Sequence, residues 1–345
     1  MKKLVIFNLA TDPDHKLLGA SLDWIEAFRD HFVVTDVVST HVGKNVQLEN
    51  IKIWELGGGS LRLRIVALFR LLLFALDLIS RRKDYLVFHH MSPRTAVFPG
   101  ILFKIFGIPQ ALWYSHSSKP MSLKISLRIV DNLFSSENHS FPYVTKNLHL
   151  VGHGISLKRF DTNAQSNKRM KSVLFVGRIS KIKNLDKLIN QISLLNGKLP
   201  IILFGPITSK DYLQEIENLA SNRNVELEVH DPINYVNVGP VMAQYQYFYA
   251  GMANSVDKSA LEAAISGCFV LTTDKGTQEL SGMNRIWEQL NVKESVSIKE
   301  QIEILESLEE GNLITLRELS RNWSIHKNGL SSTIAEISTI MKKKI

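Results

Sequence analysis

The stretch VLFVGRISKIKNLDKLI, residues 173–189, decides the fold of the second half of the chain. Its first residues predict a buried strand, and the spacing of apolar residues after Gly177 predicts a helix. Arg178, Lys181 and Lys183 stand at the start of that helix, where unpaired N–H groups and the positive end of the helix dipole disfavour cations. The pattern therefore indicates an anion at this place, such as a diphosphate held by Arg178 and Lys183. A solvated basic loop is the alternative.

A second helix start with a misplaced cation lies in NSVDKSALEAAISG, residues 254–267. Lys258 stands in its first turn, Glu262 follows one turn later, and Gly267 is a natural C-terminal stop. Glu262 can face the same site as Lys258. Two structural roles are equally open for Glu262: a capping box with Ser259, and an ion pair with Lys258 four residues away.

Short β-rich runs alternate with helical patterns along the whole chain. This alternation predicts an α/β protein with two doubly wound parallel sheets, whose ligands lie beyond the carboxyl ends of the strands. We place the first domain at 1–165 and the second at 166–325, and we expect a C-terminal helix, about 326–345, to pack back on the first domain. The expected helices include Ser21–Phe32, one from Leu61, Thr95–Phe106, one from Asn184, one through Ile216, and one over SALEAAIS.

The composition is that of a globular protein of two domains. The chain has 345 residues, 45% hydrophobic and 21% charged, which is too long for one ordinary core. Its single cysteine, Cys268, lies in an apolar run, so we expect a buried side chain rather than a catalytic thiol, and a reducing cytoplasm. The start MKKLVIFNLATDPDH resembles a signal peptide. However, Asp12, Pro13 and Asp14 stand where the small residues of a cleavage site would be expected. We interpret it as the first strand, which disfavours an exported binding protein.

The formal net charge of +8 is concentrated in the first half of the chain, where residues 1–150 hold 18 Lys and Arg against 12 Asp and Glu. Residues 61–83, LRLRIVALFRLLLFALDLISRRK, are more apolar than a helix covering a sheet needs to be, yet Arg70 and Asp77 interrupt them. We expect this helix to lie on an anionic membrane surface without crossing it. The alternative is a domain helix buried on two sides. Nucleic-acid binding is disfavoured, because the aromatic residues lie in apolar runs and no recognition motif is present.

Several common site motifs are absent from the sequence. Neither GxGxxG nor GxxxxGK[ST] occurs, which disfavours a nicotinamide dehydrogenase or a P-loop ATPase. The carboxylates of Asp12 and Asp14 have no neighbouring carboxylate cluster, and the histidines lack the spacing of metal ligands. We therefore expect no metal site.

Several stretches of the chain, taken in order, resemble the retaining glycosyltransferases of family four, which have the GT-B fold. The resemblance covers nearly the whole chain and implies two Rossmann-like domains that face each other across a cleft. The matching stretches are LATDPDHKLLGASLDWI (9–25), WYSH (113–116), GHGISLKRF (152–160), and GRISKIKNLDKLI (177–189) with DKSALEAAISGCFVLTT (257–273).

The resemblance implies roles for individual residues. Arg178 and Lys183 would bind the diphosphate of a nucleotide-sugar, and Glu262 its ribose hydroxyls. His116 would hydrogen-bond the donor sugar near the reacting carbon. The complete expectation is His116, Arg178 and Lys183 in catalysis; Gly19, Asn254, Lys258, Ser259 and Glu262, with Arg178 and Lys183, at the donor; and His15 and His90 at the acceptor.

The chain departs from the family pattern at Asn254. The family commonly has a glutamate eight positions before Glu262, and that residue usually touches hydroxyls of the transferred sugar. An amide can donate and accept hydrogen bonds there.

The resemblance implies transfer of a sugar, with retention, from a nucleotide-diphosphate-sugar to a lipid-linked or growing cell-surface glycan at the inner face of the plasma membrane. Fixed cations would stabilise the departing diphosphate without a metal or a cofactor. The alternatives are a nucleotide-sugar epimerase on the same fold and a basic, non-catalytic binding protein.

Overall fold

The computed structural model divides the chain into two compact units, Met1–Ser156 with Gly329–Ile345, and Leu157–Asn328. It describes residues 2–13, 19–44, 46–57, 61–160, 169–195, 197, 199–252, 256–292 and 296–343, without the side chains at 61, 63 and 64. The division lies at Ser156, whereas the sequence placed it at residues 165/166, a position outside the described residues. The first unit also contains the end of the chain from Gly329 onward.

The sheet of the first unit has seven parallel strands. They are β1 (Lys3–Thr11), β2 (Val33–Val42), β3 (Lys52–Glu55), β4 (Tyr85–His90), β5 (Gln110–Trp113), β6 (Asn132–Ser135) and β7 (Leu148–Leu150). Their order is β3-β2-β1-β4-β5-β6-β7, so the direction of winding reverses between β1 and β4. The predicted doubly wound sheet is confirmed.

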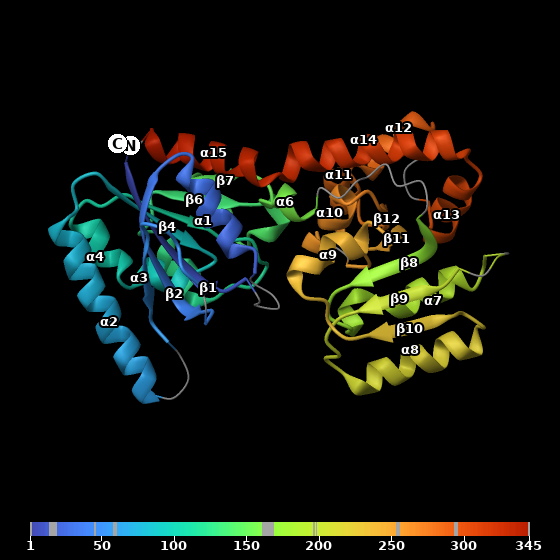
Figure 1. Ribbon diagram of the computed structural model, residues 1–345, viewed down its shortest axis with the longest axis horizontal. Coiled ribbons are helices and arrows are strands. Elements are labelled where there is room, and N and C mark those ends of the chain that lie inside the picture. Colours follow the sequence, from blue (N-terminus) through green and yellow to red (C-terminus); the bar gives the residue numbers. More distant parts are fainter. Residues whose placement is uncertain are drawn as a thin grey trace. The chain divides into compact units, whose positions relative to one another are not determined.

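Helices cover both faces of this sheet (Figure 1). Ile6 of β1 packs with Trp24 and Ile334 on one face, and its neighbour Phe7 packs with Phe74 on the other, as the two-residue period of a strand requires. No helix in the described part of the chain is long and apolar enough to span a membrane. The helices are α1 (Ser21–Arg29), α2 (Leu61–Ser80), α3 (Pro93–Val97), α4 (Gly100–Ile105), α5 (Met121–Ser126), η1 (Asn138–Ser140) and α15 (Leu330–Lys342).

The expected helix Thr95–Phe106 is two helices, α3 and α4, so the prediction of a continuous helix was wrong. Pro99 separates them and precedes the first residue of α4. Because proline has no N–H group and its ring clashes with the preceding turn, a helix cannot run through this position undisturbed.

The sheet of the second unit has five parallel strands. They are β8 (Met170–Val176), β9 (Ile201–Phe204), β10 (Leu227–His230), β11 (Tyr245–Tyr249) and β12 (Phe269–Leu271). Their order, β10-β9-β8-β11-β12, reverses between β8 and β11. That reversal is the point at which open α/β sheets bind ligands.

The strands of the second unit are connected and covered by short helices. They are α6 (Leu157–Phe160), η2 (Lys181–Lys183), α7 (Leu185–Ile192), α8 (Lys210–Asn222), α9 (Tyr235–Met242), α10 (Lys258–Ile265), α11 (Lys275–Ser281), α12 (Met283–Gln289), α13 (Ile298–Glu306) and α14 (Glu310–Asn328). The expected helix starts at Asn184 and near Lys258 are both present, since Asn184 is the N-cap of α7 and Asp257 that of α10. Gly267 ends α10 with a φ of 85°.

Candidate functional site

The two stretches with misplaced cations meet in the second unit, beyond the ends of β8 and β11. The ammonium of Lys183 donates to the carboxylate of Asp257, the N-cap of α10. The Asn184 side-chain amide donates to the carbonyl of Gly251 at 2.6 Å. A Cβ atom on Gly251 would lie 2.2 Å from the carbonyl oxygen of Lys183, so only glycine permits this approach. The fold thus joins residues 74 positions apart in the sequence.

Lys183 is buried and already has an anionic partner, which the sequence did not anticipate. Besides Asp257, its Nζ atom lies 3.0 Å from the sulfur of Met252. An ammonium has three N–H donors, and one of these contacts is to a weak acceptor. An anionic ligand could therefore displace the sulfur while Asp257 keeps its ion pair.

Arg178 has the opposite environment. Its side chain is exposed, and within the described residues the guanidinium has neither a hydrogen-bond nor an ion-pair partner. Five N–H donors are thus available to a ligand without loss of an existing contact.

The start of α10 has polar groups that the described residues leave without partners. No side chain caps this helix, because the carboxylate of its N-cap, Asp257, binds Lys183 instead. The Oγ atom of Ser259 is shielded from solvent and has no hydrogen-bond partner in the described part of the chain. The capping box considered for Ser259 and Glu262 is therefore not formed, and the first turn of α10 can accept an anion.

Glu262 is buried beside Lys258 and Tyr235. Its carboxylate lies 3.3 Å from the Lys258 ammonium and accepts a hydrogen bond of 3.3 Å from the Tyr235 hydroxyl. The ion pair weighed from the sequence is thus present. Burial raises the pKa of Glu262, although the ammonium opposes this shift. Burial alone would lower the pKa of Lys258, but the Tyr235 phenol and the Glu262 carboxylate outweigh it and raise this pKa.

Tyr235 and Arg159 belong to this cluster and were missed from the sequence. The Arg159 guanidinium lies 5.1 Å and the Lys258 ammonium 5.5 Å from the centre of the Tyr235 ring. Gly239 permits this arrangement, because a Cβ atom there would lie 2.0 Å from the carbonyl oxygen of Arg159. The run GHGISLKRF contained Arg159, but nothing in its spacing pointed to a tyrosine 76 residues later.

In the first unit, Gly19 and His116 follow β1 and β5, and His90 is the last residue of β4; these three strands are neighbours in the sheet. The ring of His90 stacks on Trp24 at 4.4 Å. The Nδ1 atom of His116 accepts the Ser118 backbone N–H at 2.9 Å. The proton of the neutral ring therefore lies on Nε2, which can donate to a ligand. His15 and Asn254 lie outside the described residues.

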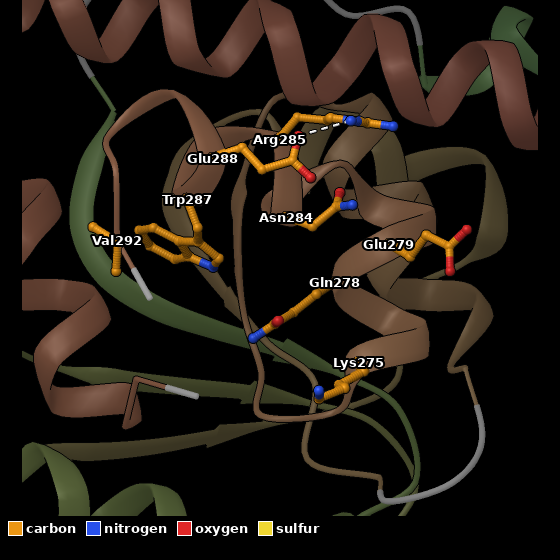
Figure 2. A pocket seen from close by; sticks show the side chains of 8 residues that line it. All are labelled: Lys275, Gln278, Glu279, Asn284, Arg285, Trp287, Glu288 and Val292. Carbon is orange, nitrogen blue, oxygen red and sulfur yellow. Dashed lines mark hydrogen bonds and ion pairs between the residues drawn. The ribbon is translucent and has the colours of Figure 1, made fainter. Parts of the chain in front are cut away.

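The second unit also contains a hollow of about 280 Å³ that the sequence did not suggest (Figure 2). The indole of Trp287 lies at one side of it, and the carboxylate of Glu279 points away from that ring. Within the described residues, the buried Nε1 of Trp287 and Oδ1 of Asn284 have no hydrogen-bond partner. The hollow is lined by Lys275, Gln278, Glu279, Asn284, Arg285, Trp287, Glu288 and Val292.

Two further residues singled out in the sequence have structural environments. Cys268 is fully buried and donates to the carbonyl of Met242 at 3.1 Å, and burial raises the pKa of its thiol to about 11. Asp12 lies 3.2 Å from the imidazole of His41. Among the described residues, no three His, Cys, Asp or Glu side chains are grouped so that they could hold a metal ion.

Comparison with known proteins finds similarity in structure but not in sequence. No family model matches the chain, and no curated protein does. Anabaena Alr3699/HepE in complex with UDP-glucose superposes with a TM-score of 0.71 at 12% identity, over 99% of this chain and 100% of that one. The sucrose-phosphate synthase from Thermosynechococcus elongatus gives 0.71 at 14% identity, over 100% and 99%. A glycosyltransferase from Rickettsia africae ESF-5 gives 0.72 at 13% identity, over 99% and 98%.

At such identities the likeness shows the fold. The chain has the GT-B fold, which confirms the fold expected from the sequence.

Proposed function

We propose that this GT-B chain is a retaining glycosyltransferase, which moves a sugar from a nucleotide-diphosphate-sugar to an acceptor hydroxyl. The observation that carries the proposal is the start of α10, where Lys183, Lys258 and the Oγ of Ser259 lie near the helix end. The described residues give this helix end no side-chain cap and the Ser259 Oγ no hydrogen-bond partner. Helix starts of this kind bind phosphate groups. The likeness to a structure that holds UDP-glucose supports the same class of donor.

The donor would occupy the end of the second sheet, where its direction of winding reverses. The N–H groups of Lys258 and Ser259 would hydrogen-bond one phosphate, and Arg178 and Lys183 would neutralise the other charges. The carboxylate of Glu262 would accept the ribose hydroxyls. Its neighbour Tyr235 fixes the orientation of this carboxylate by a hydrogen bond. Asn254 would contact the sugar and influence which sugar is accepted.

The cations would act on the departing group. Breaking the anomeric bond leaves negative charge on the diphosphate and positive charge on the sugar, and charges already in position stabilise that transition state without reorganisation. Arg178, Lys183 and Lys258 would provide this stabilisation without a metal or a cofactor. His116 would donate from Nε2 to a sugar oxygen, since its Nδ1 already accepts a hydrogen bond. The leaving phosphate would take the acceptor proton.

The proposed acceptor is a lipid-linked or growing cell-surface glycan at the inner face of the membrane. His90 would contact it, together with His15. The support for a lipid-linked acceptor is helix α2 of the first unit, which exposes apolar side chains such as Ile65 and Phe69.

The test begins with a thermal-shift screen of nucleoside diphosphates and nucleotide-sugars. A ligand at about 100 times its dissociation constant stabilises the native state by about 2.7 kcal/mol, so the correct base should be evident. Incubation with the matching nucleotide-sugar and acceptor glycans should then give a product with the anomeric configuration of the donor, measured by NMR. An epimerised or unchanged sugar in the presence of every acceptor would contradict the proposal.

A further inference from the structure

Helix α2 exposes an apolar stripe on the side opposite to the core. Phe74 and Leu78 of this helix are fully buried. Ile65, Phe69 and Leu73 follow one another at intervals of four residues, so that they lie on one side of the helix. Their exposed fractions are 60%, 60% and 48%. An ordinary covering helix has polar residues at such positions.

Helix α4 extends this apolar stripe. It packs beside α2, as Figure 1 shows in the first unit. Nine of the 20 exposed large apolar side chains in the described residues lie on these two helices or directly after α4. We call them the outer face. They are Ile65, Val66, Leu68, Phe69, Leu73, Leu76, Ile101, Ile105 and Phe106. Scattered apolar residues need no explanation, but exposed apolar residues gathered on two helices that contact each other indicate an interaction site.

The chain around the outer face carries all of the protein's excess positive charge. Residues 61–128 hold 11 Lys and Arg against two Asp, a net charge of +9, which leaves 30 basic and 31 acidic residues elsewhere. Both acids are paired, since Asp77 lies 2.5 Å from Arg81 and Asp84 lies 2.7 Å from Lys2. The charged residues of the segment that contains the outer face are therefore almost all cationic.

We infer that the outer face binds the surface of an anionic lipid bilayer. Its apolar side chains would enter the boundary between headgroups and acyl chains, with α2 lying along the membrane plane. The exposed Arg62 before the stripe, and Arg82 and Lys83 after it, would lie at the level of the lipid phosphates.

A second copy of the chain fits this surface less well than a bilayer does. A two-fold symmetric dimer through the outer face would bring the same cationic segment onto both sides of the interface. Juxtaposed like charges oppose association. Anionic lipid offers the complementary charge and an apolar layer together.

This inference goes beyond the proposed transferase activity. Vesicle binding needs neither donor nor acceptor, so the membrane inference and the proposed transferase function can fail independently of each other. Binding of nucleoside diphosphates by the same variants reports separately on the second unit.

The experiment measures co-sedimentation of the full chain with vesicles of phosphatidylcholine, with and without about one-third phosphatidylglycerol. One variant replaces Ile65, Phe69 and Leu73 by glutamine, and another replaces Arg62, Arg82 and Lys83 by glutamine. Arg81 is left intact, because its guanidinium lies 3.5 Å from the carboxylate of the buried Asp36. Circular dichroism checks that each variant is folded.

Each variant has a matched control that removes similar exposed side chains outside residues 61–128. The apolar control replaces Val144, Leu194 and Val236 by glutamine, and the charge control replaces Lys146, Lys210 and Arg223.

We expect the wild type to bind anionic vesicles, more weakly in high salt, and the two controls to bind equally well. At about 1 kcal/mol for each cation near the surface, the charge variant should lose roughly 100-fold in affinity. The apolar variant should also lose binding.

Three results would overturn the inference. They are recovery of the wild type in the supernatant with both kinds of vesicle, equal losses in variants and controls, and self-association that the apolar variant abolishes without any vesicle binding.

Discussion

Helices α2 and α10 are both exceptions to the rule that apolar side chains are buried and charged ones are exposed. Helix α10 buries a carboxylate, Glu262, and holds Lys258 beside it, whereas α2 exposes Ile65 and Phe69. A buried charge needs a partner of opposite charge. An exposed apolar side chain needs no partner for the protein to stay folded and soluble. The charges of α10 are therefore bound to the rest of the second unit, whereas the outer face of α2 has little effect on folding. The charged site at α10 is thus part of the internal contacts of its domain, whereas the outer face of α2 is a surface on which folding does not depend.

The largest expected effect tests the two sides of α2. Replacing the buried Phe74 by alanine should lower the free energy of unfolding by about 3–5 kcal/mol, because it leaves a cavity beside Phe7. Replacing the exposed Phe69 by alanine should change it by less than about 0.5 kcal/mol. Urea denaturation without lipid measures both. Equal losses would mean that the outer face is covered in solution.

For the proposed donor site, the most informative variant for catalysis is Arg178→Ala. Removing this cation should lower kcat/KM by about 100-fold or more, which corresponds to about 3 kcal/mol of transition-state stabilisation. The melting temperature should not change, since the side chain is exposed and has no partner among the described residues. Arg223→Ala, another exposed arginine of the second unit, serves as the control. Undiminished turnover in Arg178→Ala would remove it from the donor site.

Lys183→Ala should act on stability as well as on turnover. The substitution leaves Asp257 without its cation and should cost about 2 kcal/mol in unfolding free energy. This is less than a fully buried pair loses, because the Asp257 side chain is 20% exposed. Adding Asp257→Asn should restore part of the stability but not the activity. The exposed Lys187→Ala is the control, and a Lys183→Ala protein as stable as that control would count against the ion pair.

His89, in the core beneath α2, is a buried ionisable group whose ring nitrogens lie beside the Thr95 hydroxyl and the Gln110 amide oxygen rather than a carboxylate. Its ring stacks on Phe7 at 5.0 Å, and burial lowers its pKa to about 3. Below pH 6.5 the unfolded chain binds a proton that the folded chain does not. Stability should therefore fall by about 1.4 kcal/mol for each pH unit between about 6.5 and 3. Urea denaturation of wild type and His89→Gln at pH 7.5 and pH 5 measures this, and parallel pH dependences would contradict it.

The smallest effect belongs to the hydroxyl of Ser259 at the start of α10. Ser259→Ala should weaken binding of the nucleoside diphosphate by about threefold to tenfold, the contribution of one neutral hydrogen bond. Stability should not fall, because this hydroxyl has no partner to lose in the described residues. Ser209→Ala, which removes the N-cap of α8, should do the reverse and cost about 1 kcal/mol in stability. Calorimetric titration and thermal denaturation distinguish the two patterns.

The sequence could predict the fold because its signals are local. Apolar runs such as VLFV form strands. Asn184 begins a helix and Gly267 ends one, as their residue types predict. Pro99 could have been interpreted as a helix break. The partner of Lys183 could not be predicted, because Asp257 is 74 residues away and only the sheet order brings them together. The faces of α2 were also unpredictable, since apolar residues lie on both sides of it and only packing selects the buried one.

The first unit is discontinuous, and this has a consequence for its synthesis on the ribosome. Its core includes Leu330, Ile334 and Ile337 of α15, and the Thr333 hydroxyl donates to the carbonyl of Val151 at 2.7 Å. These residues are translated after the whole second unit. Until then, the part of the first unit's core that α15 covers stays exposed in residues 1–156. The second unit is continuous and can complete its fold first. The usual order, in which the N-terminal domain of a nascent chain matures first, therefore leaves this unit incomplete, and a stop codon just before Gly329 would leave one face of the larger sheet without its covering helix α15.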